Sequence, residues 1–271
     1  MTNLRNVVKY LESVAPQSLT IGDHDSRIEI GPQAEQEQIN TTIKRILIAT
    51  YPSGRVVTRS TQDKANLLIT HFPIFQFPVS QISGLDLVRI RLLAKNYISS
   101  YVLGSAIIGA RNGLSDALVE TLGLQQVQEF YTIGKYSETV SFGRICKMNG
   151  EMNHSRFADY IAMKLGQDSV TFTGDLDQQV SSILVCPGHH MDIPNIIAAN
   201  HMNINTIVTG RIAPECRLIA SEQGLNVIEV REFVMEEIGM KRLRHRMSLE
   251  FPELKIEFTE SEPISKTLRS R

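Results

Sequence analysis

The chain of 271 residues is predicted to be an α/β protein with two subdomains, each a largely parallel sheet with flanking helices. Two observations predict this class. Short, continuous apolar runs, which are typical of buried parallel strands, recur along the chain, and segments with apolar residues at helical spacing separate them. The alternation occurs over residues 40–124 and again over 154–230, as expected when helices cross over between parallel strands.

The first half begins with a helix and a polar region, and then alternates strand and helix. The elements expected, in order, are a helix over 3–14, a strand over 43–50, a short helix after Gly54, a strand over 66–70, a helix over 83–96, a strand over 97–104 and a helix over 113–124. Residues 18–42 are polar and turn-rich, with only one short apolar run. Ser115 or Asp116 is the expected N-cap of the last helix, and Gly123 is its expected C-terminal stop.

The second half repeats the alternation. The elements expected are a helix over 154–166, a strand over 181–190 that runs into a Pro-Gly loop, a helix over 192–201, a strand over 204–211, a helix over 214–224, a strand over 225–230, a basic helical segment over 239–253 and a strand over 254–261. We place the approximate subdomain boundary between residues 125 and 126. The segment 225–271 is expected to pack back toward the first subdomain.

Composition and charge exclude several classes of protein. The formal net charge is −1, so no global field attracts nucleic acid or membranes. The basic cluster over 241–246 lacks interleaved aromatic residues and is interpreted as a solvated helix face. Cys146, Cys186 and Cys216 are scattered, which favours reduced thiols over a disulfide framework. No signal peptide and no apolar window of membrane-spanning length are found, so a cytoplasmic location is expected.

His71 is the most suggestive polar residue, because it comes directly after the apolar run Leu67-Leu68-Ile69 and Thr70. Catalytic and metal-binding imidazoles favour such strand ends, where the strand fixes the side chain and the loop leaves access. The alternative is that His71 hydrogen-bonds a neighbouring backbone group and packs in the core. The residue pattern leaves both interpretations open.

Three residues form a second candidate, for ligand binding, after the strand predicted at 181–190. Gly188 could let backbone N–H groups approach an anion at the start of the helix over 192–201. His189 and His190 follow it directly. Adjacent side chains at a strand end diverge, so the alternative is that these two imidazoles bind nothing in common.

Glu232 and Glu236 form a third candidate. They lie four residues apart and therefore share a face if the segment is helical. Two carboxylates on one face could bind a metal ion together with His71. The alternative is a solvated surface pair near Lys241 and Arg242. None of the common nucleotide-binding, nucleophile-elbow or zinc-protease motifs occurs.

Four stretches of the chain match a known family in order. They are 43–75, which contains LLITHFP, 90–124, which contains GLSDALVETLGL, 181–212 and 224–247. These stretches resemble the Nif-three-like family, whose members are dinuclear-metal, toroidal hexameric proteins often described as GTP cyclohydrolase 1 type 2 homologs. The resemblance covers about residues 4–262. It implies a Nif-three-like fold and a closed homo-oligomer, with a hexamer as the expected form.

The resemblance also places the family's metal-binding residues on this chain. Two adjacent histidines fall on His71 and Phe72, a further histidine falls on Gly104, aspartates fall on Tyr51 and Gly109, a late histidine falls on Glu232, and a late glutamate falls on Glu236. Only His71 and Glu236 keep the residue type, and Glu232 substitutes an oxygen donor for an imidazole. We therefore expect no dinuclear centre and at most a single weak site at His71, Glu232 and Glu236.

Two functional hypotheses follow. The first, which we prefer, is an oligomeric, non-catalytic or weakly metal-binding protein that binds a partner or a small molecule. The second is a metal-dependent, cyclohydrolase-like hydrolase that acts on a nucleotide-like substrate through a remodelled mononuclear site, with His189 or His190 as additional ligands. No catalytic residue is assigned, and the cofactor is either absent or one divalent cation.

Overall fold

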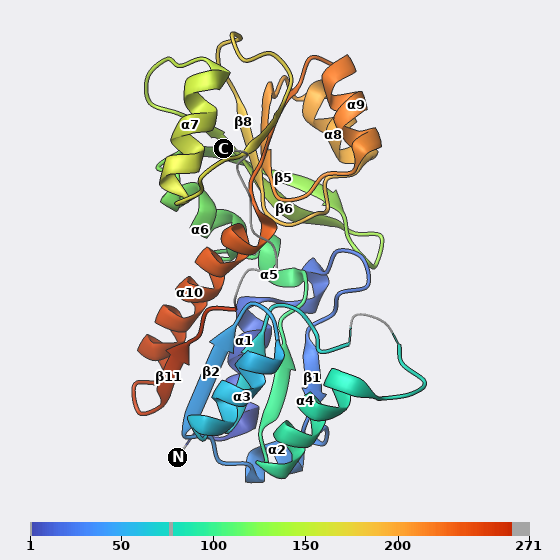
Figure 1. The fold of residues 1–271 in the computed structure, drawn as a ribbon, viewed down its shortest axis with the longest axis vertical. Helices are drawn as coiled ribbons and strands as arrows, with labels where there is room; N and C mark the ends of the chain where they lie inside the picture. Colours follow the sequence, from blue (N-terminus) through green and yellow to red (C-terminus); the bar gives the residue numbers. More distant parts are fainter. Residues whose placement is uncertain (1, 76–77, 262–271) are drawn as a thin grey trace, which may run out of the picture. The chain divides into compact units, whose positions relative to one another are not determined.

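The structure, a computed structural model, describes residues 2–75 and 78–261. Its chain separates into two compact units (Figure 1). Unit 1 comprises residues 1–9, 27–103 and 244–271, and unit 2 comprises residues 10–26 and 104–243. The predicted subdomain boundary between residues 125 and 126, and the packing of the segment 225–271 toward the first subdomain, stay predictions.

Unit 1 contains a five-stranded mixed sheet with the order β1-β4-β3-β2-β11. Its elements are β1 (Arg27–Ile30), α2 (Glu35–Asn40), β2 (Arg45–Ala49), α3 (Gly54–Gln62), β3 (Leu67–Thr70), α4 (Gly84–Lys95), β4 (Ser99–Val102) and β11 (Lys255–Phe258), and α1 (Leu4–Val14) begins here. β11, β2, β3 and β4 run parallel, and β1 pairs antiparallel with β4. The parallel strands expected from the first half of the sequence are confirmed.

The helices of unit 1 pack on the apolar side chains that the strands present on the two faces of the sheet. Leu47 and Leu68 point to one face of the sheet and pack with Val56 and Val57 of α3 and Leu93 of α4. Alternate strand residues point to the opposite face. That face lies against α1, which is drawn behind the sheet (Figure 1).

Unit 2 contains a six-stranded mixed sheet with the order β5-β6-β8-β9-β10-β7. Its elements are a 3₁₀ turn (Gln17–Leu19), α5 (Ala106–Gly109), α6 (Leu114–Thr121), β5 (Gln125–Ile133), β6 (Thr139–Lys147), α7 (His154–Lys164), β7 (Thr171–Thr173), β8 (Ile183–Cys186), α8 (Ile193–His201), β9 (Thr206–Thr209), α9 (Pro214–Glu222), β10 (Asn226–Glu229) and the first part of α10 (Glu232–Glu250). Only β8, β9 and β10 run parallel; β5, β6 and β7 join antiparallel.

Both faces of this second sheet are covered at its central strands β8 and β9. Ile183 and Val185 of β8 pack on α6 and α7, as do Val208 of β9 and Ile228 of β10. Leu184 is fully buried on the other face, where α8 and α9 lie side by side (Figure 1). Sheets covered on both faces carry continuous apolar runs in their central strands, which is why these runs were visible in the sequence.

Three local expectations were wrong or incomplete. Gly113, rather than Ser115 or Asp116, is the N-cap of α6, because Ser115 is buried and the Asp116 carboxylate has other partners. The hairpin of β5 and β6 was not expected. The C-terminal helix α10 begins at Glu232, seven residues before the predicted helical segment, so that Glu232 and Glu236 lie within it.

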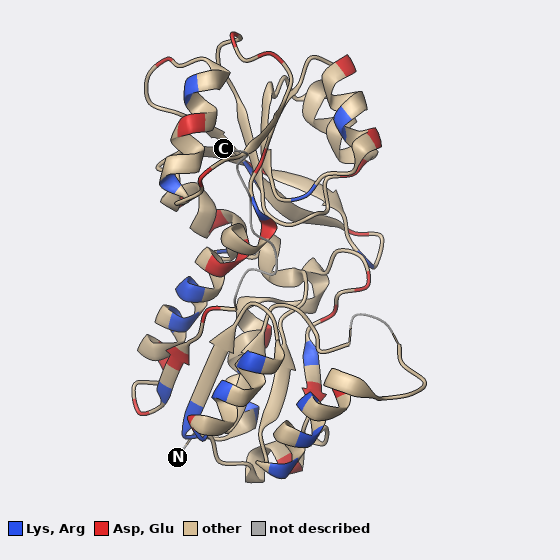
Figure 2. Ribbon diagram, in the orientation of Figure 1, with Lys and Arg blue, Asp and Glu red and all other residues tan. Residues whose placement is uncertain are grey.

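Charged residues of both signs are spread over the ribbon (Figure 2). In the basic cluster over 241–246, Lys241 pairs with Glu237, Arg242 pairs with Glu120, and Arg244 donates to the carbonyl of Ile256. Three of the basic side chains of this cluster thus engage groups of the chain itself. None of the helices in the described ranges combines the length and apolarity needed to cross a membrane.

All three cysteines are buried and free. Burial raises the pKa of the Cys146 and Cys186 thiols to about 12. A buried thiol with so high a pKa is a poor nucleophile, which agrees with the expectation of inert, reduced core residues.

Candidate functional site

His71 directly follows β3 and is only 4% exposed. The backbone N–H groups of His71 and Phe72 both donate to the carbonyl oxygen of Thr50, at 3.2 and 3.1 Å. Thr50 follows β2, the parallel neighbour of β3, so the segments that leave these two strands are tied together at one edge of the sheet. In open α/β sheets, ligands bind at this carboxyl edge.

The loop beyond His71 is held by β1. The carboxylate of Glu29, whose side chain is 7% exposed, accepts hydrogen bonds from the backbone N–H of Ile74 at 2.8 Å and of Phe75 at 3.2 Å. A buried carboxylate that accepts backbone N–H groups makes strong, charge-assisted hydrogen bonds. The backbone around His71 is therefore fixed from two sides, by β2 and by β1.

Two aromatic rings occupy the space beside His71. The rings of Tyr51 and Phe72 stack with their centroids 4.2 Å apart and their planes within 2° of parallel. The imidazole of His71 meets the Phe72 ring edge-on at 4.6 Å. Ser261 fixes the backbone of Tyr51 by accepting from its N–H at 3.0 Å. An aromatic stack thus lies directly beside this histidine.

Unit 2 gathers imidazoles at the carboxyl end of β8. His189 and His190 have ring centroids 4.4 Å apart, and His24, from the loop before β1, lies 6.2 and 6.0 Å from them. The carboxylate of Glu232 hydrogen-bonds Nδ1 of His189 and raises the pKa of this imidazole above its ordinary value, against the opposing effect of burial. Glu232 and His189, which the mononuclear-site hypothesis groups together, are thus hydrogen-bonded to each other.

Glu236 lies one turn after Glu232 on α10 and is 1% exposed, so it is not the solvated surface residue of the alternative interpretation. It adds a negative charge that also raises the pKa of His189. Because His71 belongs to unit 1 and both glutamates belong to unit 2, their predicted association in one site stays a prediction. Within residues 2–75 and 78–261, no three His, Cys, Asp or Glu side chains are already disposed to hold a metal ion.

The proposed anion site at the start of α8 has a competing group. The carboxylate of Asp192 caps this helix by accepting from the backbone N–H of Asn195 at 2.9 Å. A capping carboxylate uses a helix N–H group and places negative charge where an anion would bind. Gly188, at φ +89°, shapes the loop that presents the two histidines.

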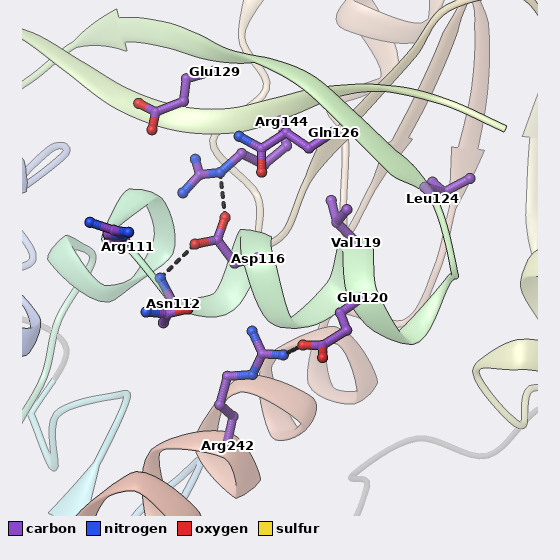
Figure 3. Close-up of a pocket in the computed structure, with 10 residues that line it drawn as sticks. All are labelled: Arg111, Asn112, Asp116, Val119, Glu120, Leu124, Gln126, Glu129, Arg144 and Arg242. Atoms are coloured by element: carbon purple, nitrogen blue, oxygen red, sulfur yellow. Dashed lines mark hydrogen bonds and ion pairs between the residues drawn. The ribbon is translucent and has the colours of Figure 1, made fainter.

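A cavity of about 580 Å³ opens elsewhere in unit 2, between α6, β5 and α10 (Figure 3). Its floor is the ion pair of Asp116 with Arg144, a residue of β6 that is 1% exposed. Arg242 pairs with Glu120 at another wall, and the exposed Arg111 lines the cavity as well. No sequence pattern indicated this cavity, since the β5–β6 hairpin that forms one side of it was not expected.

Comparisons with known proteins agree with the geometry of the fold. A family model described as Duf34/NIF3 (NGG1p interacting factor 3) matches residues 2–265. The chain belongs to the NIF3 family. It is 21% identical over 244 residues to a Methanocaldococcus jannaschii protein described as a GTP cyclohydrolase 1 type 2 homolog, a match that covers 90% of this chain and 94% of the relative.

Solved structures confirm the NIF3-like fold. Protein SA1388 of Staphylococcus aureus superposes with a TM-score of 0.82 at 18% identity, covering 99% of each chain. A Bacillus cereus protein related to NIF3 superposes equally well, with a TM-score of 0.82 at 17% identity, covering 100% of this chain and 99% of the other. Such low identities show a shared fold and leave the chemistry of this chain to its own residues.

Two glycines test whether this NIF3 chain can hold the two-metal centre that the family resemblance implies. A Cβ at Gly109 would lie 1.7 Å from the carbonyl oxygen of Ser141, and a Cβ at Gly104, where φ is +62°, would lie 2.0 Å from that of His24. The main chain therefore leaves no room for a ligand side chain at either position. With Tyr51 and Phe72 stacked at two others, the residues present do not fit a two-metal centre.

Proposed function

We propose that this chain is a non-hydrolytic member of the NIF3 family that binds a small molecule or a partner and has no two-metal centre. The Tyr51–Phe72 stack beside His71 carries the proposal, because it puts two stacked aromatic rings where the family resemblance expects a carboxylate and an imidazole. A bridging carboxylate offsets the repulsion between two dications, and neither ring can supply one. The proposed form is a closed homo-oligomer, as the family resemblance implies.

Metal titration tests this proposal. Full-length protein freed of metal by chelation is expected to bind fewer than two zinc or manganese ions per chain at micromolar affinity. The double variant Tyr51→Asp and Phe72→His returns two donors to the surroundings of His71, and we expect it to bind zinc at least tenfold more tightly than the wild type.

Phe75→His is the matched control, since Phe75 is a half-buried aromatic residue of the same loop. It is expected to leave zinc affinity unchanged. Binding of two ions by the wild type would overturn the proposal, and so would an equal gain from the control. GTP hydrolysis by the wild type that His71→Gln abolishes would favour the mononuclear hydrolase instead.

The cavity of unit 2 supports the small-molecule form of this proposal. Its volume of about 580 Å³ falls within the roughly 300–1,000 Å³ typical of ligand pockets. Two of its three guanidinium groups pair with carboxylates, whereas no ion pair of Arg111 is recorded within the described ranges. The carboxylate of Glu129 lines the cavity as well, so Arg111 is the group on which binding of an anionic ligand, a carboxylate or a phosphate, would depend.

Calorimetric titration with citrate and with inorganic phosphate tests this form of the proposal. Arg111→Met is expected to weaken binding at least fivefold, whereas Arg156→Met, on the exposed side of α7, is expected to leave it unchanged. Equal affinities in wild type and Arg111→Met, or no binding of either anion, would remove the cavity from the proposal.

A further inference from the structure

The sequence contains two Asn-Gly pairs, Asn112-Gly113 and Asn149-Gly150, and both asparagines are exposed. An asparagine that precedes a glycine is chemically labile. The backbone nitrogen of the next residue can attack the side-chain amide carbon, and glycine has no Cβ to hinder that approach. The sequence makes the two pairs equally reactive, because glycine follows in both. The fold places them in different surroundings.

The fold holds Asn112-Gly113 in place at the start of α6. The backbone N–H of Asn112 donates to the carboxylate of Asp116. The N–H of Gly113 donates to the carbonyl oxygen of Ala110 at 2.8 Å. Gly113 is the buried N-cap of α6, and a Cβ there would lie 2.1 Å from the carbonyl oxygen of Ile107. The nitrogen that would attack is therefore hydrogen-bonded and lacks the room to move toward the Asn112 amide.

Asn149-Gly150 lies in the exposed loop between β6 and α7. Gly150 has φ at +90°, and apart from its chain neighbours no heavy atom lies within 4 Å of the position that a Cβ would take. For the N–H of Gly150 and the side chain of Asn149, no hydrogen bond is recorded within residues 2–75 and 78–261. An exposed backbone segment with few contacts samples other conformations readily, so the nitrogen of Gly150 can reach the amide carbon of Asn149.

We propose that Asn149 is the site of spontaneous deamidation in this chain and that the fold protects Asn112. The backbone nitrogen of Gly150 loses its proton and attacks Cγ of Asn149, so that a succinimide ring closes. The bond from Cγ to the amide nitrogen breaks, and this nitrogen takes up a proton and leaves as ammonia. Water then adds to one of the two ring carbonyls and opens the ring, which gives aspartate or isoaspartate. Water is the only co-reactant.

The difference between the two pairs has consequences for the chain. Either product at position 149 places a new negative charge near Glu151, and isoaspartate also adds a methylene to the main chain. Asn112 lines the cavity of unit 2 and precedes Gly113 directly after Arg111. Its protection keeps a neutral amide there, whereas a carboxylate would compete with an anionic ligand for Arg111. The inference goes beyond the proposed function, because it depends on no ligand, partner or metal ion.

Peptide mapping by mass spectrometry tests the inference on the full-length protein. After incubation at pH 8 and 37 °C, we expect the peptide with Asn149 to deamidate at least tenfold faster than the peptide with Asn112, with isoaspartate among its products. The same incubation in urea exposes both pairs to solvent. The two rates should then agree within about threefold, because the difference between them comes from the fold.

Asn149→Gln is the matched variant, because it keeps an amide at this position but lengthens the side chain, which disfavours ring closure. It should abolish deamidation at position 149 and leave both the rate at Asn112 and the melting temperature unchanged. Equal rates at the two pairs in the folded protein, or a faster reaction at Asn112, would overturn the inference. So would a rate at Asn149 that urea raises at least tenfold, since the loop would then be as protected as the start of α6.

Discussion

Arg144 is the largest fully buried side chain among the described residues. Its guanidinium donates to the carboxylate of Asp116, to the Ser141 hydroxyl at 2.9 Å, and to the carbonyl oxygens of Gly143 and Gly109 at 3.0 and 3.1 Å. A cation that is desolvated to this extent is tolerated only because each of these acceptors offsets part of its lost hydration. The arginine thereby joins β6, α5 and α6.

Arg144→Met is expected to lower the free energy of unfolding by about 3–5 kcal/mol, because it leaves the carboxylate of Asp116 without its cationic partner and several backbone carbonyls without their donor. Urea denaturation measures this loss. Arg111→Met is the control, since this exposed arginine lines the same cavity, and we expect it to change the free energy of unfolding by no more than about 0.5 kcal/mol. Similar losses in both variants would contradict the structural role of Arg144.

His154 makes stability depend on pH. Its ring is fully buried, with Nδ1 on the carbonyl of Gln178 at 2.7 Å and Nε2 on the hydroxyl of Thr206 at 2.8 Å. Burial lowers the pKa of this imidazole, against the opposing effect of its hydrogen bond to Gln178. The unfolded chain therefore takes up the proton at higher pH than the folded protein does, near the ordinary pKa of about 6.5.

The contribution of His154 to stability is thus complete above about pH 6.5 and is lost as the pH falls toward the lower pKa of the folded state. Urea denaturation of the wild type and of His154→Gln at several pH values tests this. The stability difference between the two proteins should shrink between pH 7.5 and pH 5.5. A difference that stays constant over this range would show that the ring does not titrate as the structure indicates.

Individual residues could be predicted from the sequence only where the residues around them formed a recognisable pattern. The position of His71 at a strand end was visible, because the apolar run before it is continuous. The burial of Arg144 was not visible, because Gly143 and Arg144 itself interrupt the apolar pattern of its strand. His24 carried no signal at all, because an isolated histidine in a polar loop is ordinary until the fold brings it to the histidines after β8.

Strands were predictable where burial on both faces produced a continuous run of apolar residues. β3, β8 and β9 are buried along their whole length, and β2 is buried at every residue after Arg45, so that each is visible in the sequence as an apolar run. β5 is an edge strand whose residues are mostly exposed on both faces, so it shows no period-2 alternation. That difference explains why the parallel centre of each sheet was expected and the antiparallel hairpin was not.

The packing of α5 on β6 gives a prediction at this scale. Gly109 ends α5, and a Cβ there would lie 1.7 Å from the carbonyl oxygen of Ser141 in β6. Gly109→Ala is expected to cost at least about 2 kcal/mol of stability in thermal or urea unfolding, because backbone rather than a flexible side chain would have to move. Gly54→Ala, at the open start of α3, is the control.

No heavy atom lies within 4 Å of the position that a Cβ at Gly54 would take. The control is therefore expected to leave stability unchanged or to raise it by up to about 1 kcal/mol, the advantage of alanine over glycine in a helix. If Gly109→Ala proved as harmless as Gly54→Ala, α5 would not be packed on β6 as described.

At the scale of the whole molecule, the NIF3 family match extends over residues 2–265 and so includes both units. Composition and motifs alone went no further than an α/β protein with one suggestive histidine; the order of four short stretches along the chain carried the family assignment. The oligomeric state depends on which surfaces contact other copies of the chain, and the spacing of apolar residues along the sequence does not predict it.

We expect the protein to form a closed homo-oligomer, with a hexamer as the family form. Native mass spectrometry at micromolar concentration, supported by light scattering, measures this. The mass of one chain is 30.4 kDa, so a hexamer corresponds to about 180 kDa. Observation of monomer alone at these concentrations would contradict the expectation.

The close contact at Gly104 also limits which residues this position can accept. Any residue other than glycine at position 104 would bring its Cβ to 2.0 Å from the His24 carbonyl, in a left-handed backbone conformation that L-residues rarely adopt. A histidine cannot enter there by one codon change, since the loop that carries His24 would first have to move. A single substitution at position 104 therefore cannot supply an imidazole there, and any new donor in this region has to come from another position.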